Sequence, residues 1–227
     1  MSRGVFVTGT DTGIGKTTVS CALLHALRAR GLKAIGMKPV ASGCERTPEG
    51  WRNDDALRLI AASDPRLDYA LVNPYALPEP TAPEIAAREA GVTLALAPMR
   101  DAYAALAAQA DVVLVEGVGG WASPLSAELD QADLARALGL PVLLVVGLRL
   151  GCINHARLAA RSIRADGFAL AGWIGSAVDP DFAHREPTVA ILQRRIEAPM
   201  LGWLPHREGA PVATLHASHL AHAAACI

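Results

Sequence analysis

The stretch VFVTGTDTGIGKTT, residues 5–18, decides the fold. It opens with a β-branched and aromatic run typical of a strand covered on both faces, passes through glycines, and ends in Gly-Lys-Thr-Thr before apolar residues recur at helical spacing. A glycine-rich turn between a strand and a helix directs backbone N–H groups and the positive helix end at one point, which suits a phosphate chain. We therefore expect Lys16 to lie along the outer phosphates and the Thr17 hydroxyl to hold magnesium.

The loop departs from the usual phosphate-binding signature in one respect. Thr10 stands where a glycine is usual, and Gly9 lies one place earlier, so the loop is longer by one residue. A turn that only connects strand to helix is the alternative. The strand before, the helix after and the Gly-Lys-Thr-Thr ending favour phosphate binding, because a simple connection requires none of them.

Strand and helix patterns alternate along the rest of the chain. Short apolar runs predict buried strands at 5–7, 112–115 and 142–146, with weaker strand patterns at 33–37, 169–174 and 199–204. Apolar residues at helical spacing predict helices at 17–30, 99–110, 131–138 and 154–165. This alternation predicts one α/β domain over residues 1–227, with a mostly parallel sheet flanked by helices on both faces, of the P-loop NTPase type.

Composition favours small diffusible substrates. The 227 residues are 52% hydrophobic, enough for one sizeable core, and the net charge of −1 is spread without basic clusters, so neither nucleic acid nor a membrane surface is an expected partner. Four cysteines are widely spaced, which fits reduced thiols better than a zinc site or a disulfide framework. Residues 1–4 run directly into the first predicted strand, so we expect no leader segment, and no apolar stretch approaches the roughly 18 to 20 residues of a membrane span. We expect a soluble, cytoplasmic protein.

Charged residues follow several predicted strands. Glu116 ends the 112–115 run and precedes glycines, where a magnesium-associated acid is expected, although it could only cap a turn. Lys38 follows the 33–37 strand at the same sheet edge as Lys16, with a solvated surface charge as the alternative. Asp54 and Asp55 open a helical pattern, so both could be simple helix caps.

Two further segments are less regular. Four prolines between residues 69 and 83 predict an irregular loop at the edge of a pocket. His216, His219 and His222 recur every third residue, which could indicate a metal site. We expect instead a mobile, alanine-rich terminal helix with exposed histidines, because nothing nearby supplies an acid or supporting partners, and we assign no function to the tail beyond Arg207.

Six motifs in order carry a family resemblance: GTDTxxGKT, KPVASG, NxDA, NPY, EGVGG and GLRLGCINH. Together they resemble the dethiobiotin synthetase family from Val5 to about Leu204. The resemblance implies ATP-dependent closure of a ureido ring from 7,8-diaminononanoate and CO2 (bicarbonate) in biotin synthesis, with Mg2+. It also implies a homodimer with the diamine at the subunit interface. An amine and CO2 give a carbamate, whose oxygen takes the γ-phosphoryl group before the second amine closes the ring.

The resemblance also implies residue roles. Lys16 and Lys38 match the catalytic cations, and Thr17, Asp55 and Glu116 match the magnesium positions, with Asp54 the less favoured of the adjacent acids. The matched nucleotide-binding residues are Asp11, Thr12, Gly13, Ile14, Gly15, Lys16, Thr17, Thr18, Glu116, Gly117, Val118, Gly119, Ser176, Pro205, His206 and Arg207. The matched substrate-binding residues are Thr12, Lys38, Ser42 and, from the opposite subunit, Leu150, Gly151, Cys152, Ile153 and Asn154.

One departure concerns the base of the nucleotide. Some relatives carry Asn-Asp where Ser176 and Ala177 stand, and an amide can pair with the donor and acceptor of adenine together, whereas serine has one hydroxyl. ATP is still expected, with softened base selectivity.

Two rival functions remain at this stage. A partitioning-type ATPase of the same superfamily would carry an extra lysine early in the loop, where Thr10 and Asp11 stand. A cobyrinate-type amidating enzyme would need a glutamine-hydrolysing domain, for which the chain has no room.

Overall fold

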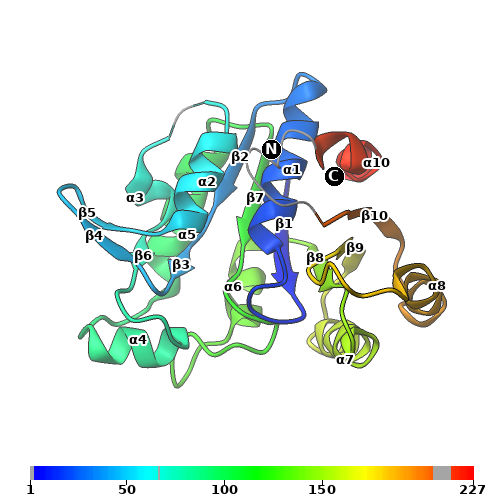
Figure 1. Cartoon of the computed structure of the whole chain (residues 1–227). Helices are drawn as coiled ribbons and strands as arrows, with labels where there is room; N and C mark the ends of the chain where they lie inside the picture. Colours follow the sequence, from blue (N-terminus) through cyan, green and yellow to red (C-terminus); the bar gives the residue numbers. More distant parts are fainter. Residues whose placement is uncertain (1–2, 66, 207–215) are drawn as a thin grey trace.

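Six parallel strands form the centre of the molecule (Figure 1). The computed structural model describes residues 3–65, 67–206 and 216–227. The strands are β1 (Arg3–Gly9), β2 (Ala34–Met37), β7 (Val112–Glu116), β8 (Val142–Gly147), β9 (Leu170–Ser176) and β10 (Met200–Leu204). Their order is β10-β9-β8-β1-β7-β2, and each neighbouring pair is parallel. The predicted parallel sheet is confirmed.

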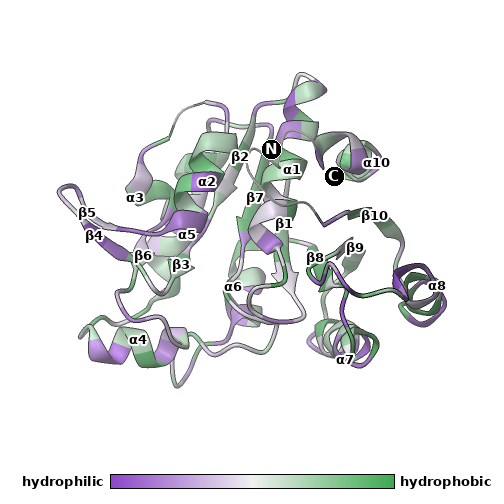
Figure 2. Ribbon diagram, viewed as in Figure 1, coloured by the Kyte–Doolittle hydropathy of each residue, from purple (hydrophilic) through white to green (hydrophobic). Residues whose placement is uncertain are grey.

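Helices cover both faces of this sheet (Figure 1). On one face lie α1 (Lys16–Ala29), α2 (Asp54–Ala62) and the C-terminal η1 (Ala217–Leu220) and α10 (Ala221–Cys226). On the other lie α4 (Pro83–Glu89), α5 (Leu96–Ala107), α6 (Gln131–Leu138), α7 (Cys152–Ala165) and α8 (Arg185–Arg195). The hydropathy colours agree, with green strands inside and purple concentrated on the outward parts of the helices (Figure 2). The predicted two-sided covering is thus confirmed.

The strands read as continuous apolar runs because each face packs against a different helical layer. Phe6 belongs to the core beneath α5 and α6, whereas its neighbours Val5 and Val7 belong to the core beneath α1. All five residues of β7 and all six of β8 are buried. The six strands of the central sheet share these two helical layers, and the division of the chain into a single domain stays a prediction.

Short elements occupy part of the predicted irregular segment. α3 (Tyr69–Val72) and β6 (Tyr75–Ala76) lie inside residues 69–83, and β6 pairs with β3 (Val40–Ala41). The prediction of a wholly irregular loop is therefore wrong for these residues. Asp68 caps α3 by accepting from the N–H of Ala70. This short helix was not predicted because the nearby prolines indicated an irregular loop. A second small pairing joins β4 (Glu45–Thr47) to β5 (Gly50–Arg52) as an antiparallel hairpin.

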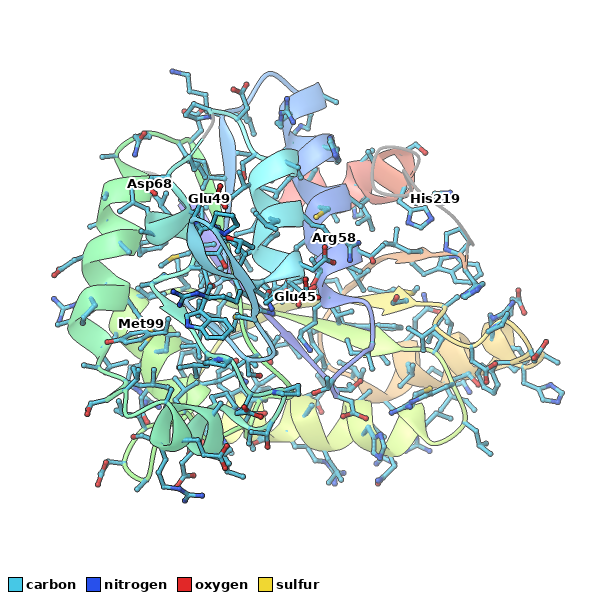
Figure 3. The ribbon with its side chains drawn as sticks, turned by 60° about the vertical axis from the view of Figure 1, so that its left-hand side comes forward. Glu45, Glu49, Arg58, Asp68, Met99 and His219 are labelled. Atoms are coloured by element: carbon cyan, nitrogen blue, oxygen red, sulfur yellow. The ribbon has the colours of Figure 1, made fainter. Side chains whose placement is uncertain are left out.

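The C-terminal segment differs most from expectation. Residues 207–215 lie outside the described part of the chain, but η1 and α10 pack on α1 through the buried side chains of Leu220, Ala223 and Ala224. His216 is only 2% exposed, so its predicted exposure is wrong. The sequence did not predict this buried face, because two of its three residues are alanines, which are small and only weakly hydrophobic. His219 and His222 are exposed as expected, and Figure 3 labels His219 at the surface.

In the portion of the chain that the structure describes, no helix combines the length and apolar character needed to cross a membrane.

Candidate active site

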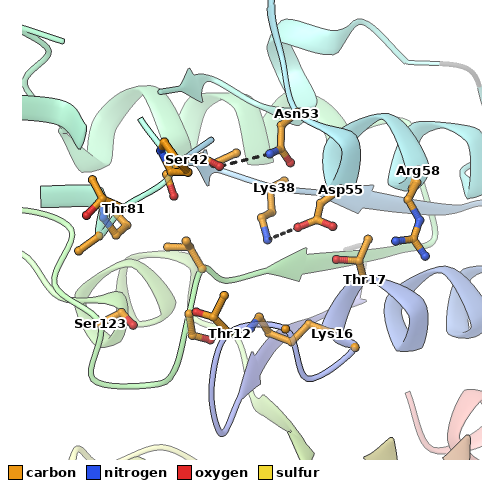
Figure 4. A pocket seen from close by; sticks show the side chains of 18 of the residues that line it. Thr12, Lys16, Thr17, Lys38, Ser42, Asn53, Asp55, Arg58, Thr81 and Ser123 are labelled. Atoms are coloured by element: carbon orange, nitrogen blue, oxygen red, sulfur yellow. Dashed lines mark hydrogen bonds and ion pairs between the residues drawn. The ribbon is translucent and has the colours of Figure 1, made fainter. Parts of the chain in front are cut away.

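A cavity of about 700 Å³ opens where β1, β2 and β7 end (Figure 4). Parallel strands bring their carboxyl ends to one sheet edge, so the segments that follow them meet there. The phosphate loop follows β1, Lys38 follows β2, and Glu116 ends β7. Residues 80–83 close one side, so part of the proline-rich segment does border a pocket, as predicted.

The phosphate loop has the expected strand-turn-helix form. Gly13 and Gly15 adopt φ values of 71° and 84°, which favour glycine. A Cβ on Gly15 would lie 2.5 Å from Oγ of Ser176, so this position also leaves no room for a side chain. No side chain caps the start of α1, which leaves its first N–H groups to a ligand. Phosphate binding itself stays a prediction.

Lys16 bridges two loops across the cavity floor. Its Nζ donates to the carbonyl oxygens of Asp11 at 2.8 Å and Gly119 at 2.7 Å. Burial, and then the nearby charge of Lys38, lower the pKa of Lys16 to about 8. The hydrogen bonds of Lys16 go to neutral carbonyls and its pKa is lowered, so an anionic ligand beside it would stabilise the charged form.

Glu116 organises the opposite wall and is fully buried. Its Oε1 accepts from Oγ1 of Thr17 at 2.8 Å and from Nζ of Lys38 at 2.7 Å. Its Oε2 accepts from Oγ of Ser20 at 2.8 Å. The alternative that Glu116 only caps a turn is wrong. Ser20 was missed, although its position one helical turn after Thr17 could have placed it on the same face.

Lys38 lies between two carboxylates and is 3% exposed. Nζ lies 3.4 Å from Oδ2 of Asp55, opposite its contact with Glu116, and also donates to the carbonyl of Gly117 at 3.1 Å. Burial alone would lower the pKa of Lys38, but the charges of Glu116 and Asp55 outweigh it and raise the pKa. Lys38 is therefore a buried cation, and the alternative of a solvated surface charge is wrong.

The two adjacent aspartates differ in their surroundings. Asp55 lines the cavity beside Lys38 and Thr17, whereas Asp54 is exposed and makes no ion pair with Lys38. Burial would raise the pKa of Asp55, but the positive charge of Lys38 and the Thr17 hydrogen bond lower it on balance. An ionised Asp55 at the cavity agrees with the expectation that Asp55, and not Asp54, is the magnesium ligand. Asn53, not either aspartate, caps α2 by accepting from the N–H of Ala56.

The predicted magnesium residues supply only oxygen atoms. Thr17 contacts both Glu116 and Asp55, so a hydroxyl and two carboxylates converge at one wall. Hard oxygen ligands of this kind fit Mg2+, which often binds through few protein groups, water and substrate phosphates. Among the described residues, no cluster of three or more His, Cys, Asp or Glu could hold an ion. The set fits a magnesium ion shared with a nucleotide.

Thr12 and Ser42 lie on two sides of the cavity, which Lys38 also lines (Figure 4). The N–H of Thr12 donates to Oδ1 of Asp11 at 2.7 Å, which shapes the loop around this residue. The carbonyl of Ser42 accepts a long contact of 3.5 Å from Nδ2 of Asn53. Both positions fit contact with a small ligand beside the lysines.

The structure does not bring residues 150–154 to this cavity within one chain. All of them except the buried Cys152 border a separate hollow at the start of α7, and Leu150 is 89% exposed. Cys152 is buried, and burial raises the pKa of its thiol, which argues against a nucleophilic role. An ion pair between Asp11 and Arg149 links this turn to the phosphate loop.

The predicted base-side residues flank the phosphate loop. Ser176 ends β9 beside Gly15, and Nδ1 of His206 lies 3.1 Å from the carbonyl oxygen of Ala177. The N–H of Ala177 donates to Leu204 at the end of β10, which holds the two strand ends together. Pro205 is half-buried next to His206, and Arg207 lies outside the described residues.

Known proteins with related sequences settle the family. A family model described as an AAA domain matches residues 3–210. An ATP-dependent dethiobiotin synthetase from Xanthomonas euvesicatoria is 65% identical over 208 residues, spanning 92% of this chain and 93% of that protein. The chain belongs to the dethiobiotin synthetase family. A synthetase from Xylella fastidiosa is 63% identical, covering 88% of this chain and 89% of its own.

Solved structures share the fold of this synthetase family member at low sequence identity. The MinC:MinD cell division complex of Aquifex aeolicus gives a TM-score of 0.62 at 13% identity, covering 99% of this chain and 94% of that chain. The septum site-determining protein MinD of Pyrococcus horikoshii, solved with Mg-ADP, gives 0.58 at 15% identity, covering 99% and 95%. At such identities the likeness concerns the fold, and the sequence relatives do not favour the partitioning-type alternative.

Proposed function

We propose that the protein is an ATP-dependent dethiobiotin synthetase, a ligase of biotin synthesis that closes a ureido ring. It converts 7,8-diaminononanoate, CO2 and ATP into dethiobiotin, ADP and phosphate. Strong similarity to curated synthetases over nine-tenths of the chain supports this assignment. The observation that carries it in the structure is the pair of buried lysines, Lys16 and Lys38, at one cavity with the phosphate loop.

The proposed reaction has three bond-forming steps. One amine of the diamine attacks CO2 and loses a proton, which gives a carbamate. A carbamate oxygen then attacks the γ-phosphorus as the bond to the ADP oxygen breaks, which gives a carbamic-phosphoric mixed anhydride. The second amine attacks the carbamate carbon, closes the ring and expels phosphate, which carries the former carbamate oxygen.

The charges in the cavity suit the middle step. An anionic carbamate must approach an anionic triphosphate, so positive charge placed beforehand lowers the barrier. Lys16 belongs to the phosphate loop, and Lys38 lines the same cavity as Thr12 and Ser42, whose hydroxyls would contact the diamine and carbamate (Figure 4). Thr17, Asp55 and Glu116 would hold Mg2+, which supplies further positive charge at the phosphates.

The surface around α7 supports the proposal of a homodimer. Leu150 and Leu158 are 89% and 55% exposed, more than any other large apolar side chain among the described residues. Large exposed apolar side chains of this kind favour burial against a partner. We propose that residues 150–154 of one subunit bind the carboxylate tail of the diamine in the other, using N–H groups at the start of α7. A cytoplasmic location is also proposed, supported by four unpaired thiols.

Mass detection of dethiobiotin from diamine, bicarbonate and MgATP tests the proposed function. We expect product and ADP to accumulate together, and neither to form without the diamine. ATP hydrolysis that proceeds equally without diamine and bicarbonate, and yields no ring product, would overturn the proposal in favour of a nucleotide-switched protein.

A further inference from the structure

A buried glutamine, Gln131, contacts the loop of residues 117–120, which follows β7 and accepts hydrogen bonds from both lysines. It is the first residue of α6 and is 1% exposed. Its Oε1 accepts from the N–H of Val118 at 2.8 Å, and its Nε2 donates to the carbonyl of Val118 at 2.6 Å and to that of Gly120. One amide therefore uses donor and acceptor together to hold consecutive peptide units.

The held loop supplies the carbonyl groups that contact both lysines. The Gly117 carbonyl accepts from Lys38 at 3.1 Å, and the Gly119 carbonyl accepts from Lys16 at 2.7 Å. Val118, which Gln131 contacts twice, lies between these two glycines. The orientation of its flanking peptide units thus sets where both ammonium groups find their partners.

Close packing shows that the contact is built into the chain. A Cβ on Gly117 would lie 2.1 Å from Oε1 of Gln131, so this glycine is required for the amide to reach the loop. Gly119 has a φ of 62°, which again favours glycine. The two glycines let the backbone bend around the amide.

Gln131 is not needed to start its own helix. α6 already carries a capping box, in which Asp130 and Asp133 satisfy each other's backbone N–H groups. The Gln131 side chain instead reaches across 11 to 13 residues of sequence to the loop after β7. Its buried polar contacts therefore serve the loop.

We propose that Gln131 is a positioning residue for ring closure, acting through residues 117–120 on Lys16 and Lys38. This inference rests on the proposed function of the two lysines. We call the hydrogen bonds from Gln131 to Val118 and Gly120 the clamp. Without the clamp the loop can move, and small displacements of charged groups at a reacting centre lower the reaction rate strongly.

The first test compares Gln131→Met with Gln109→Met. Gln109 is an exposed glutamine just after the end of α5, and its Nε2 donates to the carbonyl of Ala105 in that helix at 2.9 Å, so it serves as a control away from the cavity. Both variants are assayed where circular dichroism shows them fully folded. We expect Gln131→Met to lower kcat by about tenfold or more, with the KM for the diamine changed little. A kcat within about twofold of the Gln109→Met control would overturn the inference.

The second test uses Gln131→Glu and a pH profile. A protonated carboxyl group can both donate and accept, whereas the ionised form only accepts and repels the Val118 and Gly120 carbonyls. We expect kcat of this variant, relative to the native enzyme, to rise as pH falls from 8 to 6. The comparison is made per folded protein, measured by circular dichroism at each pH, so that loss of folding does not produce this dependence, and a flat ratio contradicts the inference.

Hydrogen exchange of the backbone amides distinguishes failure of the proposed function from failure of the role given to Gln131. The Val118 N–H should exchange faster in Gln131→Met than in Gln109→Met, whatever the reaction is. If the native protein makes no dethiobiotin while this exchange difference holds, the proposed function fails and the clamp stands. If the native protein is active and the exchange of Val118 is unchanged, the clamp fails alone.

Discussion

The ammonium of Lys38 lies 2.7 Å from Oε1 of Glu116, a carboxylate with no exposure to solvent. Such a buried pair has two consequences. It keeps Lys38 protonated at the cavity. It also means that removing either partner leaves the other as an unpaired buried charge, which lowers the free energy of unfolding by about 3–5 kcal/mol. Variants at this pair must therefore separate catalysis from stability.

Lys38→Met tests the catalytic cation. We expect nucleotide binding to persist while dethiobiotin formation is lost, because the phosphate loop is intact but the carbamate has no facing positive charge. Binding is measured by titration with a fluorescent ATP analogue and product by mass. Normal turnover in this variant would refute the role given to Lys38.

Stability of the same variant provides its control. We expect the free energy of unfolding to fall by about 3–5 kcal/mol in Lys38→Met and to recover in part when Glu116→Gln is added, because the carboxylate is then neutral. Denaturant unfolding measures both. No recovery in the double variant would show that the ion pair is not the reason for the loss.

Asp55→Asn and Asp54→Asn form a matched pair that tests the magnesium site. Asp55 faces Thr17 and Lys38, whereas Asp54 is exposed. We expect Asp55→Asn to raise the free Mg2+ needed for half-maximal activity by about tenfold or more, and Asp54→Asn to leave it unchanged. Equal effects of the two changes would exclude the assigned ligand set.

Base selectivity is expected to be soft. The backbone of Ala177 is already bonded to Leu204 and faces His206, so Ser176 offers a single hydroxyl to a base edge. Initial rates with ATP, GTP and CTP at matched concentrations measure the preference. We expect less than about a hundredfold for ATP, roughly 2.7 kcal/mol, and a larger preference contradicts the expectation.

The reactivity of the cysteine thiols tests whether three of them are buried as the structure shows. Burial raises the pKa of Cys21 to about 12 and that of Cys44 to about 11, and only Cys226 of the four thiols is exposed. Iodoacetamide at pH 8 should add one label to the native chain and four in denaturant, as counted by mass. Two or more labels on the native chain would contradict the packing.

The same thiols give a pH dependence of stability. In the unfolded chain these cysteines lose protons near their ordinary pKa, while in the folded chain they keep them to higher pH. The unfolded state therefore binds fewer protons, and their contribution to stability is lost as pH rises from about 9 toward 12.

The sequence predicts the central features because local chemistry sets them. Two-sided burial produces the apolar runs of β1, β7 and β8, and parallel strands bring Lys38 and Glu116 to the phosphate loop. Gln131 could not be recognised in this way, since its role depends on tertiary contacts across 11 to 13 residues, whereas Ser20 could have been found from its place one helical turn after Thr17. The C-terminal packing was missed because alanines bury well yet carry a weak sequence pattern.

Oxygen transfer tests the central claim most directly. In a single turnover with freshly added 18O-labelled bicarbonate, the carbamate oxygen that attacks the γ-phosphorus must leave with phosphate. The account predicts inorganic phosphate two mass units heavier, formed in step with dethiobiotin, with the label absent from ADP. Unlabelled phosphate formed beside dethiobiotin would contradict phosphoryl transfer to the carbamate.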